Sequence, residues 1–297
     1  CGGCMAMLVG SPDELDRITD KARVRYCSML MDQEQILETD IAVVDGSVRT
    51  REDEETLMEV RRNTRFLVAW GTCAAFGGLP ALANFFELEE LIEETYGHAA
   101  DPFSYYLKDK TAEPDQHAVE IGEHLLRKVR KVSDVVKVDY YLPGCPPRSH
   151  LLENLLLEFK GERWFEGNRR IVCNECPRKF KKTSPTNIDV FPTENGSDST
   201  CLLSLGTLCM GFLTRGDCAA ACTGGGLPCW GCRGPSDNVI KKIGAGELVE
   251  EVMLQALARR LKHPEYEIKV PLRILRFKGL NSLGFSAHFI NDVTRIR

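Results

Sequence analysis

The sequence predicts an α/β domain built on a parallel sheet, followed by an irregular, cysteine-rich domain. Residues 41–44 and 66–70 are short, continuous apolar runs, as expected of strands buried on both faces. Helical patterns separate them from each other and from a third strand at 136–142, and this alternation favours parallel strands joined by right-handed crossovers. Eight of the 13 cysteines lie between residues 173 and 232, where aliphatic residues are too sparse for a conventional core.

The helices of the first domain are predicted from apolar residues that recur at helical spacing among charged ones. Pro12 marks a plausible start for the earliest of them. The expected helices are residues 13–23, 54–63, 82–96, 119–132 and 151–159. Residues 98–114 lack such a pattern and are expected to form a loop insertion.

The second half divides into a cysteine-rich unit and a C-terminal segment. We expect a linker at 161–168, a helix at 246–261 and strand-like stretches beyond it. The predicted domains are residues 1–160, 169–235 and 236–297. Basic residues in the last of these form either a solvated face or an interface for an acidic partner; they are Lys269, Arg273, Arg276, Lys278, Arg295 and Arg297.

Composition excludes several classes of function. The formal net charge of -5 argues against nucleic acid as the main partner. No run of about 18 apolar residues is present, so no membrane span is expected. The hydrophobic content of 43% is ordinary for a soluble protein.

Four cysteines are predicted to meet at one edge of the sheet. Cys73 and Cys145 each follow a strand directly, and Cys1 and Cys4 would reach the same edge if a strand preceded them. Sites in parallel sheets form at the carboxyl ends of strands. The glycines beside these cysteines allow the backbone to approach a bulky inorganic cluster and offer amide donors to its sulfides. The alternative is four unrelated buried cysteines.

The other eight candidate ligands fall into two sets of four thiols. An odd cysteine count and short spacings oppose a disulfide framework. The long, uneven loops also differ from zinc knuckles and favour iron–sulfur clusters, so three sites in one chain suggest an electron relay. Cys27 is left over as an expected core residue. The first set is Cys173, Cys176, Cys201 and Cys209, and the second is Cys218, Cys222, Cys229 and Cys232.

Six motifs support a family resemblance. Residues 1–4, 71–78 and 143–147 resemble the three proximal-cluster motifs of the small subunit of [NiFe]-hydrogenases. Residues 173–177, 208–211 and 228–235 look like the cytoplasmic, multimeric subgroup, nearest the iron–sulfur (gamma) subunit of F420-non-reducing (methyl-viologen-reducing) hydrogenase. The resemblance covers residues 1–235 and does not extend to the tail.

This resemblance implies a flavodoxin-like first domain and three [4Fe-4S] clusters. It assigns a proximal cluster to the four cysteines at the sheet edge, a distal cluster to the first set of four and a medial cluster to the second set. Cys222 implies a complete medial cube, where periplasmic relatives have three cysteines and three irons. A carboxylate replaces a thiolate in some related clusters, which leaves Asp45 and Asp53 as alternatives. The proximal ligands are Cys1, Cys4, Cys73 and Cys145.

The implied function is electron transfer without a catalytic residue in this chain. The resemblance implies a cytoplasmic [NiFe]-hydrogenase in which a separate large subunit splits H2. Electrons would then pass through the three clusters to a small [2Fe-2S] protein and the heterodisulfide reductase complex. Two alternatives stay open: a relay or sensor subunit of a redox complex without hydrogenase activity, since the first-domain design recurs in the quinone-reducing subunit of respiratory complex I, and a zinc-stapled interaction protein.

Overall fold

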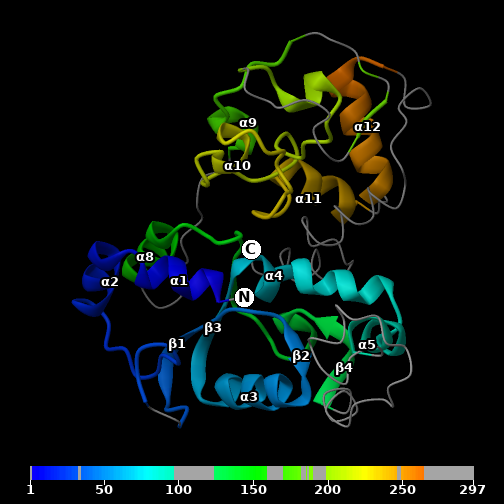
Figure 1. Cartoon of the computed structure of the whole chain (residues 1–297). Helices are drawn as coiled ribbons and strands as arrows, with labels where there is room; N and C mark the ends of the chain where they lie inside the picture. The colour runs from blue at the N-terminus through cyan, green and yellow to red at the C-terminus, as the bar shows by residue number, and fades with distance from the viewer. Residues whose placement is uncertain are drawn as a thin grey trace, which may run out of the picture.

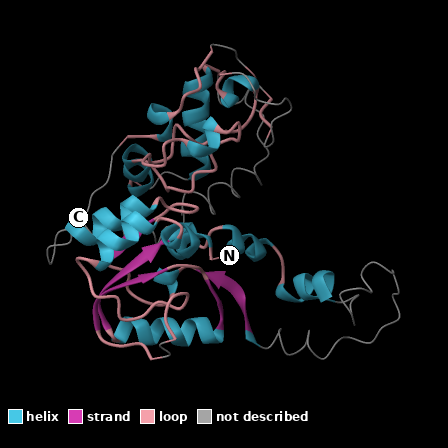
Figure 2. Cartoon of the chain, turned by 60° about the vertical axis from the view of Figure 1, so that its left-hand side comes forward, coloured by secondary structure: helices cyan, strands magenta, loops and turns pink. Residues whose placement is uncertain are grey.

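The first domain is organised around a three-stranded parallel sheet of order β1-β3-β5 (Figures 1 and 2). The computed structural model describes residues 2–32, 35–96, 124–158, 170–181, 185, 187–189, 199–245 and 249–263. β3 (Thr64–Trp70) pairs on one side with β1 (Thr39–Val44) and on the other with β5 (Tyr140–Leu142). The predicted α/β class and its parallel sheet are therefore confirmed.

Helices bury both faces of the sheet, as the continuous apolar runs require. Leu67 and Ala69 of β3 pack with Leu57 of α3 (Arg51–Arg62). The alternate residues Val68 and Trp70 face the opposite core. That second core includes α8 (Ser149–Glu158), with α1 (Gly3–Val9) and α2 (Pro12–Thr19) beside it.

The predicted helix at 119–132 is wrong over the part that the structure describes. Leu125–Arg130 is a strand, β4, which pairs antiparallel with β2 (Val48–Thr50). The Asn84 side chain completes the hydrogen bonding of β4, because its amide donates to the Val129 carbonyl at 2.8 Å and accepts from the Val129 amide at 2.7 Å. These tertiary bonds override the local helical pattern.

Other differences in the first domain are smaller. The predicted helix at 82–96 is interrupted, with a 3₁₀ helix η1 (Leu79–Phe85) followed by α5 (Leu88–Tyr96). A short 3₁₀ helix η2 (Val132–Asp134) follows β4. The expected loop insertion at 98–114 and the linker at 161–168 lie outside the described residues.

The second domain has more of an apolar core than its cysteine-rich segment predicts. Aliphatic side chains around Leu203, Leu208 and Met210 are buried together with Met253 and Leu257 of α12 (Val249–Leu261). The missing core residues therefore come from farther along the chain. Its other helices are α9 (Val172–Glu175), η3 (Leu202–Leu205), α10 (Ala221–Gly224) and α11 (Asp237–Gly244). Among the described residues, no helix is long and apolar enough to cross a membrane.

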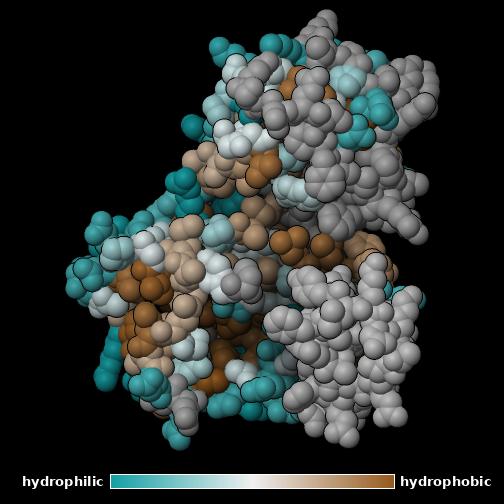
Figure 3. All heavy atoms as spheres, in the orientation of Figure 1, coloured by the Kyte–Doolittle hydropathy of each residue, from teal (hydrophilic) through white to brown (hydrophobic). Residues whose placement is uncertain are grey.

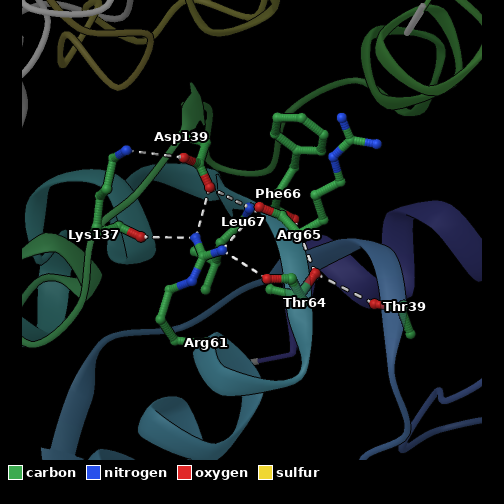
Figure 4. Close-up of polar contacts among 8 residues, drawn as sticks. All are labelled: Thr39, Arg61, Thr64, Arg65, Phe66, Leu67, Lys137 and Asp139. Carbon is green, nitrogen blue, oxygen red and sulfur yellow. Dashed lines mark hydrogen bonds and ion pairs between the residues drawn. The ribbon is translucent and has the colours of Figure 1, made fainter. Parts of the chain in front are cut away.

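An arginine network closes the end of the sheet opposite the cysteines (Figure 4). Arg61 of α3 lies 2.6 Å from the Asp139 carboxylate and donates to the carbonyls of Lys137 and Thr64. The same carboxylate accepts a hydrogen bond from the backbone of Leu67 in β3. One charge pair thus ties α3, β3 and the approach to β5 together.

We expect Arg61→Ala to lower the free energy of unfolding by about 2–3 kcal/mol, because a largely buried carboxylate loses its closest positive charge and several carbonyls lose a donor. Urea denaturation of the cluster-free chain measures this. Arg127→Ala is the matched control, since the Arg127–Glu89 pair is 74% and 63% exposed and should contribute at most about 1 kcal/mol. Equal losses in the two variants would contradict the structural role of Arg61.

Candidate metal centres

The proximal cysteines meet where β3 and β5 end. Cys73 lies in α4 (Gly71–Phe76), the short helix that follows β3 directly, and Cys145 lies in the loop after β5. The Thr72 amide donates to the Gly144 carbonyl at 2.8 Å and so joins the two loops. Cys4 of α1 reaches the same edge, since a Cβ on Gly71 would lie 2.5 Å from its sulfur. Cys1 lies outside the described residues.

The three proximal thiols influence one another electrostatically. Burial is the main cause that raises the pKa of Cys4 to about 12, and Asp45, Cys73 and Cys145 raise it further. Burial followed by Cys145 likewise raises the pKa of Cys73. Since thiolate is the form that binds metal, these buried thiols must lose protons when they bind a cluster.

The two carboxylates considered as alternative ligands have different surroundings. Asp45 follows β1 and lies in the proximal group, where burial raises its pKa. Asp53 instead forms a capping box with Thr50 at the start of α3. The role of Asp53 is therefore accounted for by the helix that it caps.

The distal cysteines come together around α9. The Cys173 amide donates to the Gly211 carbonyl at 3.3 Å, which brings the Cys209 segment alongside. Lys179 and Thr200 form a bridge that brings Cys201 back towards α9. Burial is the main cause that raises the pKa of Cys173 to about 12, and the three other distal thiols add to it: Cys209, Cys201 and Cys176.

The medial cysteines lie between the other two groups. Burial raises the pKa of Cys232 to about 12, and Cys145 of the proximal group raises it further, as do Cys218 and Cys222. At the other side, the Cys229 amide lies 3.2 Å from the sulfur of Cys209 in the distal group. The order in space is therefore proximal, medial, distal.

Glycine lies against sulfurs of the proximal and distal groups, as a close approach of the backbone to a bulky cluster requires. A Cβ on Gly78 would lie 2.6 Å from the Cys73 sulfur and one on Gly211 would lie 3.4 Å from the Cys173 sulfur, so glycine keeps room beside the ligands. None of the described cysteines forms a disulfide bond. Among the described residues, no three ligand side chains are grouped to hold one metal ion.

Two contacts between the domains had no signal in the sequence. Thr72, beside Cys73, donates its hydroxyl to the Cys232 carbonyl at 2.9 Å. Arg233, directly after Cys232, donates to the Pro143 carbonyl. Both residues lie in motifs that carry the family resemblance, 71–78 and 228–235. The contacts themselves could not be predicted, because the partners are 160 and 90 residues away along the chain.

The raised pKa of the Cys4 thiol predicts that the stability of the cluster-free chain depends on pH. The pKa of Cys4 rises from its ordinary value of 9.0 to about 12, so above about pH 9 the folded chain holds a proton that the unfolded chain has lost. Stability should therefore fall as pH rises through this window. Urea midpoints at about pH 8 and about pH 10 measure the fall. Cys4→Ser should make the stability fall less between these two pH values. An equal fall in Cys4→Ser and the wild type would contradict a contribution from Cys4.

Comparisons with known proteins agree on one family. The family model of the NADH ubiquinone oxidoreductase 20 kDa subunit matches residues 1–159. A subunit of the F420-non-reducing hydrogenase of Methanocaldococcus jannaschii is 30% identical over 89% of this chain and 88% of its own. The iron-sulfur subunit of the F420-non-reducing hydrogenase of Archaeoglobus profundus is 30% identical over 79% of each chain.

Among solved structures, a chain of NAD+-reducing [NiFe]-hydrogenase in the H2-reduced state is 31% identical, with a TM-score of 0.44 over 54% of this chain and 87% of that one. The family match covers the sheet and its helices, and the hydrogenase relatives extend through the cysteine-rich domain. The chain therefore belongs to the NADH ubiquinone oxidoreductase 20 kDa subunit family and, within it, to the small subunits of [NiFe]-hydrogenases.

Proposed function

We propose that this chain is the electron-transfer small subunit of a cytoplasmic [NiFe]-hydrogenase, and that its cysteines hold three [4Fe-4S] clusters. The observation that supports this most is the order of the three thiol groups. Cys145 raises the pKa of Cys232 in the medial group, and the Cys229 amide contacts the sulfur of Cys209. Three metal sites that adjoin one another in a row suit charge transfer across a protein better than three separate structural staples.

Each thiol group would hold one cluster. When bound, such a cluster supplies one-electron transfer without rearrangement of bonds. The protein contributes thiolate ligands and, at the medial–distal junction, a dry setting, because Cys209 and Cys229 are each only 7% exposed. Exposure and hydrogen bonds to sulfur tune the reduction potential of a cluster, and the Cys229 amide is one such donor at the medial–distal junction.

The large subunit is proposed to cover apolar surface beside the proximal group. Leu79, Phe85 and Phe86 are 62%, 48% and 53% exposed, and Leu79 follows the Gly77-Gly78 pair of the Cys73 motif. Figure 3 shows apolar side chains gathered near the junction of the two domains. Exposed apolar surface of this kind marks protein interfaces.

The proposed electron acceptors come from the likeness to F420-non-reducing hydrogenases. They are a small [2Fe-2S] protein and, beyond it, the heterodisulfide reductase complex. The first-domain family also includes a subunit of NADH ubiquinone oxidoreductase, which favours a relay in a complex without hydrogenase activity as the second candidate. The eight additional cysteines of the second domain argue against that candidate.

Anaerobic purification of the tagged chain from its native cells separates the two candidates. The proposal predicts a nickel-containing large subunit in the complex and H2-dependent reduction of methyl viologen. It also predicts a co-purifying [2Fe-2S] protein that is reduced when H2 is supplied. A complex that carries iron but neither nickel nor H2-dependent activity would favour the second candidate and overturn the proposed function.

A further inference from the structure

Arg233 is a buried charge at the junction of the two domains. It is 5% exposed and follows Cys232 directly. Its Nε donates to the Gly216 carbonyl at 2.9 Å, and its guanidinium also donates to the Pro143 carbonyl. The remaining nitrogen lies 3.8 Å from the Asp217 carboxylate. One side chain thus contacts two other segments of the protein.

Each of these contacts lies beside a candidate cluster ligand. Pro143 is two residues before Cys145 of the proximal group, and Asp217 directly precedes Cys218 of the medial group. Arginine suits this role because its planar guanidinium carries five donors in a fixed arrangement, whereas lysine offers one compact ammonium. Burying such a charge is costly unless its donors form hydrogen bonds. A buried arginine at this position therefore indicates a role beyond filling space.

Two further contacts strengthen the same junction. The Cys145 backbone lies beside the Cys232 sulfur, and the Thr72 hydroxyl donates to the Cys232 carbonyl at 2.9 Å. Gly234 also lies close to the first domain, since a Cβ there would be 2.8 Å from the Phe76 ring. The proximal and medial loops therefore form one connected structure, with the cysteine-rich domain seated above α4 (Figure 1).

We propose that Arg233 is a positioning residue that fixes the spacing between the proximal and medial clusters by tying the Cys145, Cys218 and Cys232 loops to one guanidinium. This inference rests on the proposed function, because it requires both clusters. Arg233, which is not a cluster ligand, would then control electron transfer from the proximal to the medial cluster.

Arg233→Lys and Arg233→Met in the intact hydrogenase complex test the role. Arg215→Met is the matched control, since the Arg215 side chain pairs at 3.2 Å with Asp237 of α11. The readout is the magnetic splitting between the reduced proximal and medial clusters in EPR spectra, together with iron per chain. Arg233→Lys keeps the positive charge but loses the planar arrangement of donors. It therefore separates positioning of the loops from an effect of charge alone.

We expect both Arg233 variants to retain the individual cluster signals and to lose or narrow the splitting, while Arg215→Met keeps it. Unchanged splitting in Arg233→Met would overturn the inference. So would splitting that lysine restores in full, because charge alone would then suffice. If Arg233→Met does not assemble, Arg233→Lys decides the question, and splitting equal to that of the wild type in this variant overturns the inference. A wild-type complex without two interacting clusters would instead refute the proposed function.

Discussion

Serine in place of Cys73 is expected to remove about four iron atoms per chain, one cube's complement, and to lower H2-dependent dye reduction by at least about 100-fold. Cys73 follows the central strand directly and shares the proximal group with Cys4 and Cys145. A hydroxyl in a buried site is a poor replacement for a thiolate as an iron ligand. Loss of the proximal cluster also removes the cluster proposed to adjoin the large subunit, so no parallel route remains.

Cys27→Ser is the control for this substitution. Cys27 is half-buried, and its sulfur has a contact with the Met5 sulfur at 4.0 Å. The sequence leaves it outside the three groups. Iron content and dye reduction should therefore match the wild type. Comparable iron loss in the two serine variants would show that the assignment of the proximal ligands is wrong.

Alanine at Gly78 is expected to have the second-largest effect. Gly78 has a φ of +59°, and an added Cβ would lie 2.6 Å from the Cys73 sulfur and 2.9 Å from its Cα. The Cα belongs to the backbone of α4 and has little freedom to move. The free energy of unfolding of the cluster-free chain should fall by about 3 kcal/mol or more, from the left-handed conformation and overpacking together, and proximal iron should be lost.

Gly46→Ala isolates the backbone contribution to this effect. Gly46 also has a positive φ, +85°, but an added Cβ there meets nothing within 4 Å. Gly46→Ala should lower the free energy of unfolding by about 1–2 kcal/mol, the strain of a left-handed residue. Its iron content should equal that of the wild type. Denaturant titration and iron analysis of the two variants measure both quantities. If Gly78→Ala binds as much iron as Gly46→Ala, the close approach of Gly78 to Cys73 has no part in cluster binding.

The sequence predicts the centre of the first domain well because burial leaves a strong local pattern there. β3 is apolar on both faces, and its helices bury alternate residues from each side. The position of Cys73 at a strand end follows from that pattern alone. The proximity of Cys4 to Cys73 is predicted only on the condition that a strand precedes Cys1, and the structure places Cys4 at that edge in α1.

Features that depend on distant residues escaped prediction. β4 carries a pattern that fits a helix, and only its pairing with β2 and its bonds to Asn84 make it a strand. The core of the second domain was not predicted for a similar reason, since Met253 and Leu257 supply apolar area that the cysteine-rich segment lacks. Arg233 lies in the 228–235 motif, but its contact with Pro143 was not predictable, because the two residues are 90 apart along the chain and lie in different domains.

Twelve cysteines are proposed to bind iron in three groups, and the decisive measurement is the iron and acid-labile sulfide content of the anaerobically purified chain. Three cubes predict about twelve irons and about twelve sulfides per chain, with Mössbauer spectra typical of [4Fe-4S] clusters. About four irons with eight thiols unoccupied, or zinc in place of iron, would contradict the claim.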